Sequence, residues 1–167
     1  MKAIDNLLNY LTNVFVVRIF SFNMLRLLWK YKHIPIIRDF TKHPEYGAFV
    51  ARDVGINRKT RLPVKLKVPI PIGIVLGVTR NKQIVTNIIL HELGHYEDRE
   101  YMKKLPKQEL EVRAWEKALL LAKDFNLTIE PKFAQQALNS YDVSSVTLKS
   151  LEDLVLPALD KKKKGAV

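Results

Sequence analysis

The sequence predicts an α+β fold that is mainly helical, with a short sheet before the first of two long central helices. Residues 64–68 alternate between apolar and basic side chains, which is the two-residue period of a strand. Residues 82–104 and 107–125 repeat apolar side chains at three- and four-residue spacings, which is the period of a helix. The chain has 167 residues, 47% of them hydrophobic, so we expect one core with appendages.

The N-terminal part, residues 1–45, is expected to form an apolar and basic helical extension followed by a connector. Residues 7–29 are strongly apolar, but Arg18 lies near their middle, where a charge in a membrane span is costly. Trp29 with Lys30 and Lys32 fits a helix in a membrane interface. The alternative is one or two helices that pack on the core or on a partner protein in an assembly.

A secretory signal peptide is not predicted. Asp5 and Asn6 interrupt the apolar run early, and no small-residue cleavage site follows it. We therefore expect a cytoplasmic protein, with association with a membrane or a virion as the alternatives.

The sheet is expected from residue 47 onward. Gly47 begins a short extended segment, and residues 64–68 predict a half-buried strand with a basic solvent face. Pro69 and Pro71 cannot donate to a sheet, so this strand should end there or lie at an edge. Ile72 to Val78 is then a second, more buried run, and we expect it to receive a substrate as an added strand.

Two long helices follow the sheet. Asn81 is a candidate N-cap for a helix from Lys82 to about Lys104, and Pro106 precedes a second helix from about Lys107 to Phe125. Shorter helices are expected at residues 133–138 and 148–159, and a disordered basic tail at 160–167. The charged residues 97–100 indicate a solvated helix end.

The charge balance is strongly basic. The chain has 28 Lys and Arg against 17 Asp and Glu, a net charge of +11. One basic cluster lies at residues 58–67 and another at 161–164, and an anionic membrane or a nucleic acid could bind them. The chain has no Cys, so a transition-metal site must use His and carboxylate ligands.

The sequence His91-Glu92-Leu93-Gly94-His95 lies within the first long helix and is an H-E-x-x-H motif. Residues four apart share a helix face, so both imidazoles can bind one Zn²⁺. Glu92 can then act as general base on a zinc-activated water. Gly94 is costly inside a helix, which predicts a close approach of another segment or of substrate.

A carboxylate must supply the third ligand. The other two histidines, His33 and His43, come before the motif, and no His follows His95. Of the candidates on the second helix, Glu111 shares a stripe with small side chains that would let two helices approach closely. Glu109 is the rival. The acidic candidates and the small residues of the stripe are Glu109, Glu111, Glu116, Ala114, Ala118 and Ala122.

The motif with Glu111 and Ala114 in an E-x-x-A arrangement resembles zinc metallopeptidases of the gluzincin type. It is similar to the small ImmA/IrrE-type intracellular peptidases and to the HtpX-like membrane peptidases. The resemblance covers residues 72–122 and implies a minimal zincin-like domain, which we place at residues 46–159. Trp115 departs from it, because those families usually carry Asp or Asn there to steady a ligand His.

The predicted function is that of a zinc metalloendopeptidase acting on a protein or peptide substrate. His91, His95 and Glu111 would bind zinc and Glu92 would be the general base; Tyr96, Tyr101 and Tyr141 are candidates for stabilising an oxyanion. One alternative is a catalytically silent zincin-like subunit of a larger assembly, such as a virion component. A nucleic-acid-binding module with structural zinc is less favoured, because structural zinc usually has four protein ligands.

Overall fold

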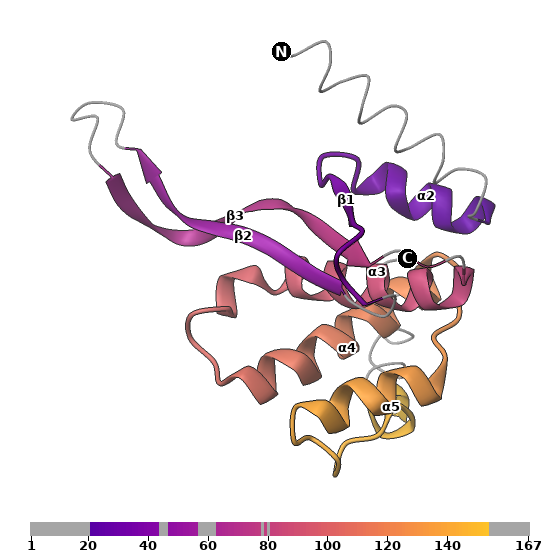
Figure 1. Cartoon of the computed structure of the whole chain (residues 1–167). Coiled ribbons are helices and arrows are strands. Elements are labelled where there is room, and N and C mark those ends of the chain that lie inside the picture. The colour runs from indigo at the N-terminus through magenta and orange to yellow at the C-terminus, as the bar shows by residue number, and fades with distance from the viewer. Residues whose placement is uncertain (1–20, 44–46, 57–62, 78, 80, 154–167) are drawn as a thin grey trace, which may run out of the picture.

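The computed structural model describes residues 21–43, 47–56, 63–77, 79 and 81–153, and shows the predicted α+β fold, which is mainly helical (Figure 1). The elements in chain order are α2 (Phe22–Lys30), β1 (Ile36–Asp39), β2 (Gly47–Ile56), β3 (Pro63–Gly77), α3 (Lys82–Glu97), a 3₁₀ turn (Arg99–Tyr101), α4 (Lys107–Asp124) and α5 (Pro131–Ser140). The basic tail and the first 20 residues lie outside the described residues.

The three strands form one sheet in the order β1-β3-β2, with β1 parallel and β2 antiparallel to β3. β3 is continuous through Pro69 and Pro71, so the prediction of two separate runs is wrong, whereas the alternative that the strand lies at an edge at the prolines is confirmed. The prolines are tolerated because β1 pairs only with residues 74–77 of β3, which leaves one side of β3 open at both prolines. The β2 partner strand also shifts register beside Pro71.

The position of β3 also corrects the predicted place for substrate. Residues 74–77 pair with β1 on one side, and residues 70–76 pair with β2 on the other. A peptide therefore cannot add to this part of β3 as a new strand. The free edge beside α3 belongs to β2.

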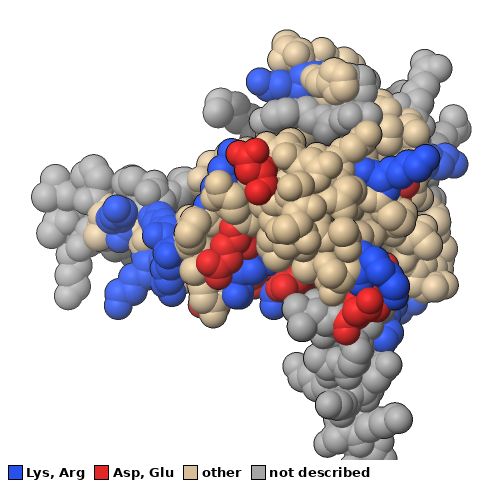
Figure 2. Space-filling model, turned by 90° about the horizontal axis from the view of Figure 1, so that it is seen from below, with Lys and Arg blue, Asp and Glu red and all other residues tan. Residues whose placement is uncertain are grey.

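The outer part of the β2–β3 hairpin projects from the body of the molecule (Figure 1). Lys65 and Lys67 are exposed, and four apolar side chains of β3 are also 42–45% exposed: Val64, Val68, Ile70 and Ile72. The predicted half-buried strand is therefore exposed on both faces, because no helix covers this part of it in the described structure. Figure 2 shows Lys and Arg side chains gathered at the hairpin end of the molecule.

α3, α4 and α5 lie below the sheet in Figure 1, and α2 contacts the chain just beyond the end of α4, where Asn23 Nδ2 donates to the Asn126 carbonyl oxygen (3.1 Å). The predicted N-cap of α3 is confirmed, because Asn81 Oδ1 accepts hydrogen bonds from the amides of Gln83 (3.0 Å) and Ile84 (3.3 Å). α3 ends at Glu97, earlier than predicted, and the 3₁₀ turn follows it. α4 begins at Lys107 as predicted.

The core joins elements from both sides of residue 46. Met24 and Leu27 of α2 and Ile34 belong to the same hydrophobic cluster as residues of α3, α4 and α5. The predicted connector contains β1, which pairs with β3. α2 and β1 are therefore integral to the fold. Within the described residues, no helix combines the length and apolar character that crossing a bilayer requires.

Candidate metal centre

The packing of α3 against α4 brings the predicted metal ligands together. Gly94 lies against the backbone of Ala114, and a Cβ at position 94 would overlap the Ala114 carbonyl oxygen and lie 2.8 Å from its carbonyl carbon. The close approach predicted from Gly94 is therefore made by the chain itself. Ala114, Ala118 and Ala122 are buried along the same stripe of α4. One turn before Ala114, the stripe places Glu111 opposite α3.

His91, His95 and Glu111 form a compact cluster. The distance from Glu111 Oε2 to His91 Nε2 is 3.1 Å and to His95 Nε2 is 3.5 Å. One ligand atom from each residue lies within 4.8 Å of the others. His91 and Glu111 are buried, at 9% and 5% exposure, and His95 is half-buried. The three residues lie close enough to hold a metal ion. Glu109, the rival ligand, is exposed and lies outside the cluster.

The hydrogen bonds within the cluster shift the pKa values of Glu111 and His95 in opposite directions. Burial raises the pKa of Glu111, but hydrogen bonds from His91 and His95 outweigh this effect and lower it to about 2. Burial lowers the pKa of His95, but its hydrogen bond with Glu111 and the nearby charge of Glu92 raise it overall. Without a metal, hydrogen bonds connect the Glu111 carboxylate to both imidazoles, and a divalent cation can take the place of the protons between the same atoms.

Trp115 holds the ring of His91 by stacking. The two ring centroids are 4.4 Å apart and the planes are inclined by 28°, and Trp115 is fully buried. Neither His91 Nδ1 nor Trp115 Nε1 has a hydrogen-bond partner among the described residues. A ligating His normally donates its second N–H to a carboxylate or carbonyl. Here the indole ring of Trp115 stacks on the His91 imidazole instead. Trp115 stands at the position where the gluzincin-type families that the motif resembles usually carry Asp or Asn.

Glu92 lies beside the cluster and is bound by the edge of the sheet. Its side chain is buried, at 5% exposure, and its Oε2 accepts a hydrogen bond of 2.6 Å from the Phe49 amide. Gly47 passes so close that a Cβ there would overlap Ile88 and lie 3.0 Å from Glu92 Oε1. The start of β2 therefore requires glycine and sets the position of the Glu92 carboxylate.

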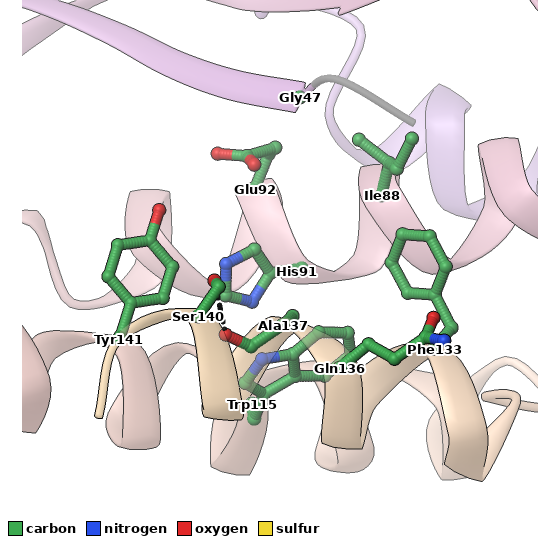
Figure 3. A pocket seen from close by; sticks show the side chains of 10 residues that line it. All are labelled: Gly47, Ile88, His91, Glu92, Trp115, Phe133, Gln136, Ala137, Ser140 and Tyr141. Carbon is green, nitrogen blue, oxygen red and sulfur yellow. Dashed lines mark hydrogen bonds between the residues drawn. The ribbon is translucent and has the colours of Figure 1, made fainter. Parts of the chain in front are cut away.

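A pocket of about 360 Å³ opens beside this carboxylate. Figure 3 shows the pocket between the start of β2, α3 and α5, with Glu92 and His91 on one wall and Tyr141 beside them. Apolar side chains and a polar rim share the lining: Ile88, Trp115, Phe133 and Ala137 are apolar, whereas Gln136, Ser140 and Tyr141 carry polar groups. The pocket can accept an apolar side chain next to the candidate metal centre.

The three candidate tyrosines are in different environments. Tyr141 lines the pocket. The hydroxyl of Tyr96 lies 3.0 Å from His33 Nε2. The ring of Tyr101 lies under the Arg113 guanidinium, with 4.3 Å from Cζ to the centroid, and does not line the pocket. Tyr141 is therefore the candidate that the pocket favours.

Asp98 corrects the expectation of a solvated helix end after the motif. Its side chain is buried, and its Oδ2 accepts a hydrogen bond of 2.5 Å from Arg113 Nε. Lys117 Nζ lies 3.5 Å from Asp98 Oδ1. These contacts hold the end of α3 against α4 beyond His95, and so support the spacing of the ligands.

Two contributors to the site were missed by sequence reasoning. The Phe49 amide carries no side-chain signature, so the sequence cannot indicate its bond to Glu92. Gly47 is one of six glycines in the chain, and the sequence analysis assigned it only to the start of a strand.

Comparison with family models, with curated proteins and with solved structures found no match to this chain.

Proposed function

We propose that this chain is a zinc-dependent metalloendopeptidase. The observation that carries the proposal is the position of Glu92, which is buried beside a His91–His95–Glu111 cluster and lines an open pocket. A general base must lie next to the metal and reach the substrate, and the position of this carboxylate beside the candidate ligands and in the wall of the pocket supports that role.

The donor set fits zinc. Two imidazole nitrogens and one carboxylate oxygen are the ligands that zinc takes in catalytic sites, where three protein ligands leave a fourth position open. When bound there, zinc supplies a Lewis acid that polarises a carbonyl and lowers the pKa of water to about 7. The buried Glu111 carboxylate, whose pKa is lowered to about 2, is ionised at neutral pH and so is available as a ligand.

Glu92 performs the proton transfers in this proposal. The Phe49 amide binds Oε2 and so orients the carboxylate. Glu92 takes a proton from the water that attacks the scissile carbonyl, and then gives it to the leaving amine as the C–N bond breaks. His91 and His95 serve as ligands and do not transfer protons.

The free edge of β2 is the proposed binding place for the substrate backbone. Phe49 lies opposite Ile74 in the sheet, yet the Ile74 amide donates to the Pro35 carbonyl (2.8 Å) and the Phe49 amide donates to Glu92. The two amides point away from each other, as in a non-hydrogen-bonded pair. The outer edge of β2 near Gly47 therefore faces the site, where an extended peptide can pair with it.

The test compares wild-type protein with E92Q and E109Q on fluorogenic peptides that carry large apolar residues. E92Q should keep stoichiometric zinc and lose about 10²–10⁴ in rate, because an amide cannot accept the proton. E109Q removes an exposed carboxylate outside the cluster and should match wild type. If wild type binds zinc but cleaves no peptide, the silent assembly subunit replaces the peptidase.

A further inference from the structure

The outward face of α2 carries two large aromatic side chains in solvent. Phe22 is 75% exposed and Trp29 is 73% exposed, and seven residues, or two helical turns, separate them. The opposite face of α2 contributes the buried Met24 and Leu27 to the core. α2 is therefore fixed to the body by one face, while the other presents aromatic rings outward.

Basic side chains accompany these rings. Arg26, Lys30 and Phe125 line a groove of about 410 Å³ together with Phe22, Leu25 and Trp29. Lys32 Nζ lies 4.7 Å from the Trp29 ring centroid. In the sequence, residues 6–38 contain no Asp or Glu and five basic residues: Arg18, Arg26, Lys30, Lys32 and Arg38.

We propose that the outward face of α2 docks on an anionic lipid membrane. Exposed aromatic rings flanked by Lys and Arg suit the membrane interface, where rings enter the headgroup region and cations meet lipid phosphates. The absence of acidic residues along α2 removes the repulsion that an anionic surface would otherwise meet. This charge complementarity selects an anionic bilayer rather than an apolar protein surface.

Docking through α2 would use residues separate from those of the candidate site. The groove beside α2 is lined by residues of α2 and by Phe125, whereas the pocket beside Glu92 shares none of these lining residues. A membrane bound to the groove residues of α2 would therefore not need to occupy the pocket beside Glu92.

The test uses the intrinsic fluorescence of the full chain, because Trp29 and the fully buried Trp115 are its two tryptophans. Vesicles of phosphatidylcholine with phosphatidylglycerol should shift the emission to the blue, and brominated acyl chains should quench it. Phosphatidylcholine vesicles alone should have little effect. About 1 M salt should reverse binding, because the Debye length falls to about 3 Å.

Two variants of equal charge locate the contact. R26Q/K30Q should weaken binding to anionic vesicles in a sedimentation assay by about tenfold or more, whereas K65Q/K67Q on the hairpin should not. The zinc content of each variant checks its fold. The proposal is overturned if K65Q/K67Q weakens vesicle binding more than R26Q/K30Q does, or if anionic vesicles leave the emission of Trp29 unchanged. It is also overturned if acrylamide fails to quench Trp29 in the absence of lipid, because protein then covers this side chain. None of these outcomes bears on the peptidase activity.

Discussion

Gly94 lies directly against the backbone of Ala114, and this contact sets the distance between the H-E-x-x-H helix and the helix that carries Glu111. The nearest atoms belong to backbone, which cannot move aside as a flexible side chain can. Gly94 is thus a structural part of the metal centre, although it has no side chain to offer to a metal.

We expect Gly94→Ala to separate α3 from α4. A methyl group gains about 1 kcal/mol in helix propensity, but the overlap with Ala114 costs about 1–3 kcal/mol and draws Glu111 away from the two imidazoles. Thermal unfolding and zinc titration should both show a loss. Thr86→Ala, a change on the same helix away from this contact, is the control. A variant with unchanged zinc affinity would show that α3 and α4 tolerate a wider spacing.

Glu111→Ala should reduce zinc affinity by more than about 100-fold, since loss of an outer-sphere partner alone costs 10–100-fold. Glu111 Oε2 is within 3.5 Å of both imidazoles, whereas Glu109 is exposed. Glu109→Ala and Glu116→Ala should leave affinity near that of wild type. Competition with a chromophoric chelator measures all three. Greater damage from Glu109→Ala would mean that α4 presents another face to α3 in solution.

The helices and ligands could be predicted because their signals are local. The spacing of His91 and His95 follows from helical periodicity, and counting four histidines required a carboxylate as third ligand. The small-residue stripe then favoured Glu111 over Glu109. Apart from the count of histidines, which uses the whole sequence, each step needed only residues within about one or two helical turns.

The sheet and the supporting contacts depend on segments distant in sequence. The pairing of β1 with β3 joins residues 36–39 to 74–77, and no local pattern indicates it. Asp98 is acidic and follows a helix, so it resembles a solvated end until Arg113 from α4 is placed beside it. The bond from Phe49 to Glu92 joins backbone to side chain across 43 residues.

The metal-free protein should be most stable in mildly acidic solution. The folded-state pKa of Glu111 is lowered to about 2, so its contribution is present above pH 4.5 and is lost as the pH falls toward 2. The pKa of His95 is raised above 6.5, so its contribution is present below 6.5 and is lost at higher pH. Unfolding of chelator-treated protein across this range measures both limits.

Glu111→Gln provides the comparison for this pH dependence. In this variant, which lacks the Glu111 carboxylate, the free energy of unfolding should fall less than in wild type when the pH is lowered below 4.5 or raised above 6.5. Zinc should bind more tightly as the pH rises above 6.5, because the His95 imidazole, whose pKa is raised, must lose its proton to become a ligand. Identical pH profiles for wild type and variant would show that the cluster does not contribute to stability.

Tyr141→Phe should lower kcat by about 10²–10³ with little change in KM, if its hydroxyl stabilises the oxyanion that forms as water attacks. Tyr141 lines the pocket with His91 and Glu92, whereas Tyr101 lies under Arg113 and does not line it. Tyr101→Phe is therefore the matched control, and steady-state kinetics on one fluorogenic peptide compare them. A rise in KM with kcat unchanged would assign Tyr141 to substrate binding, and equal rates for all three proteins would remove it from the reaction.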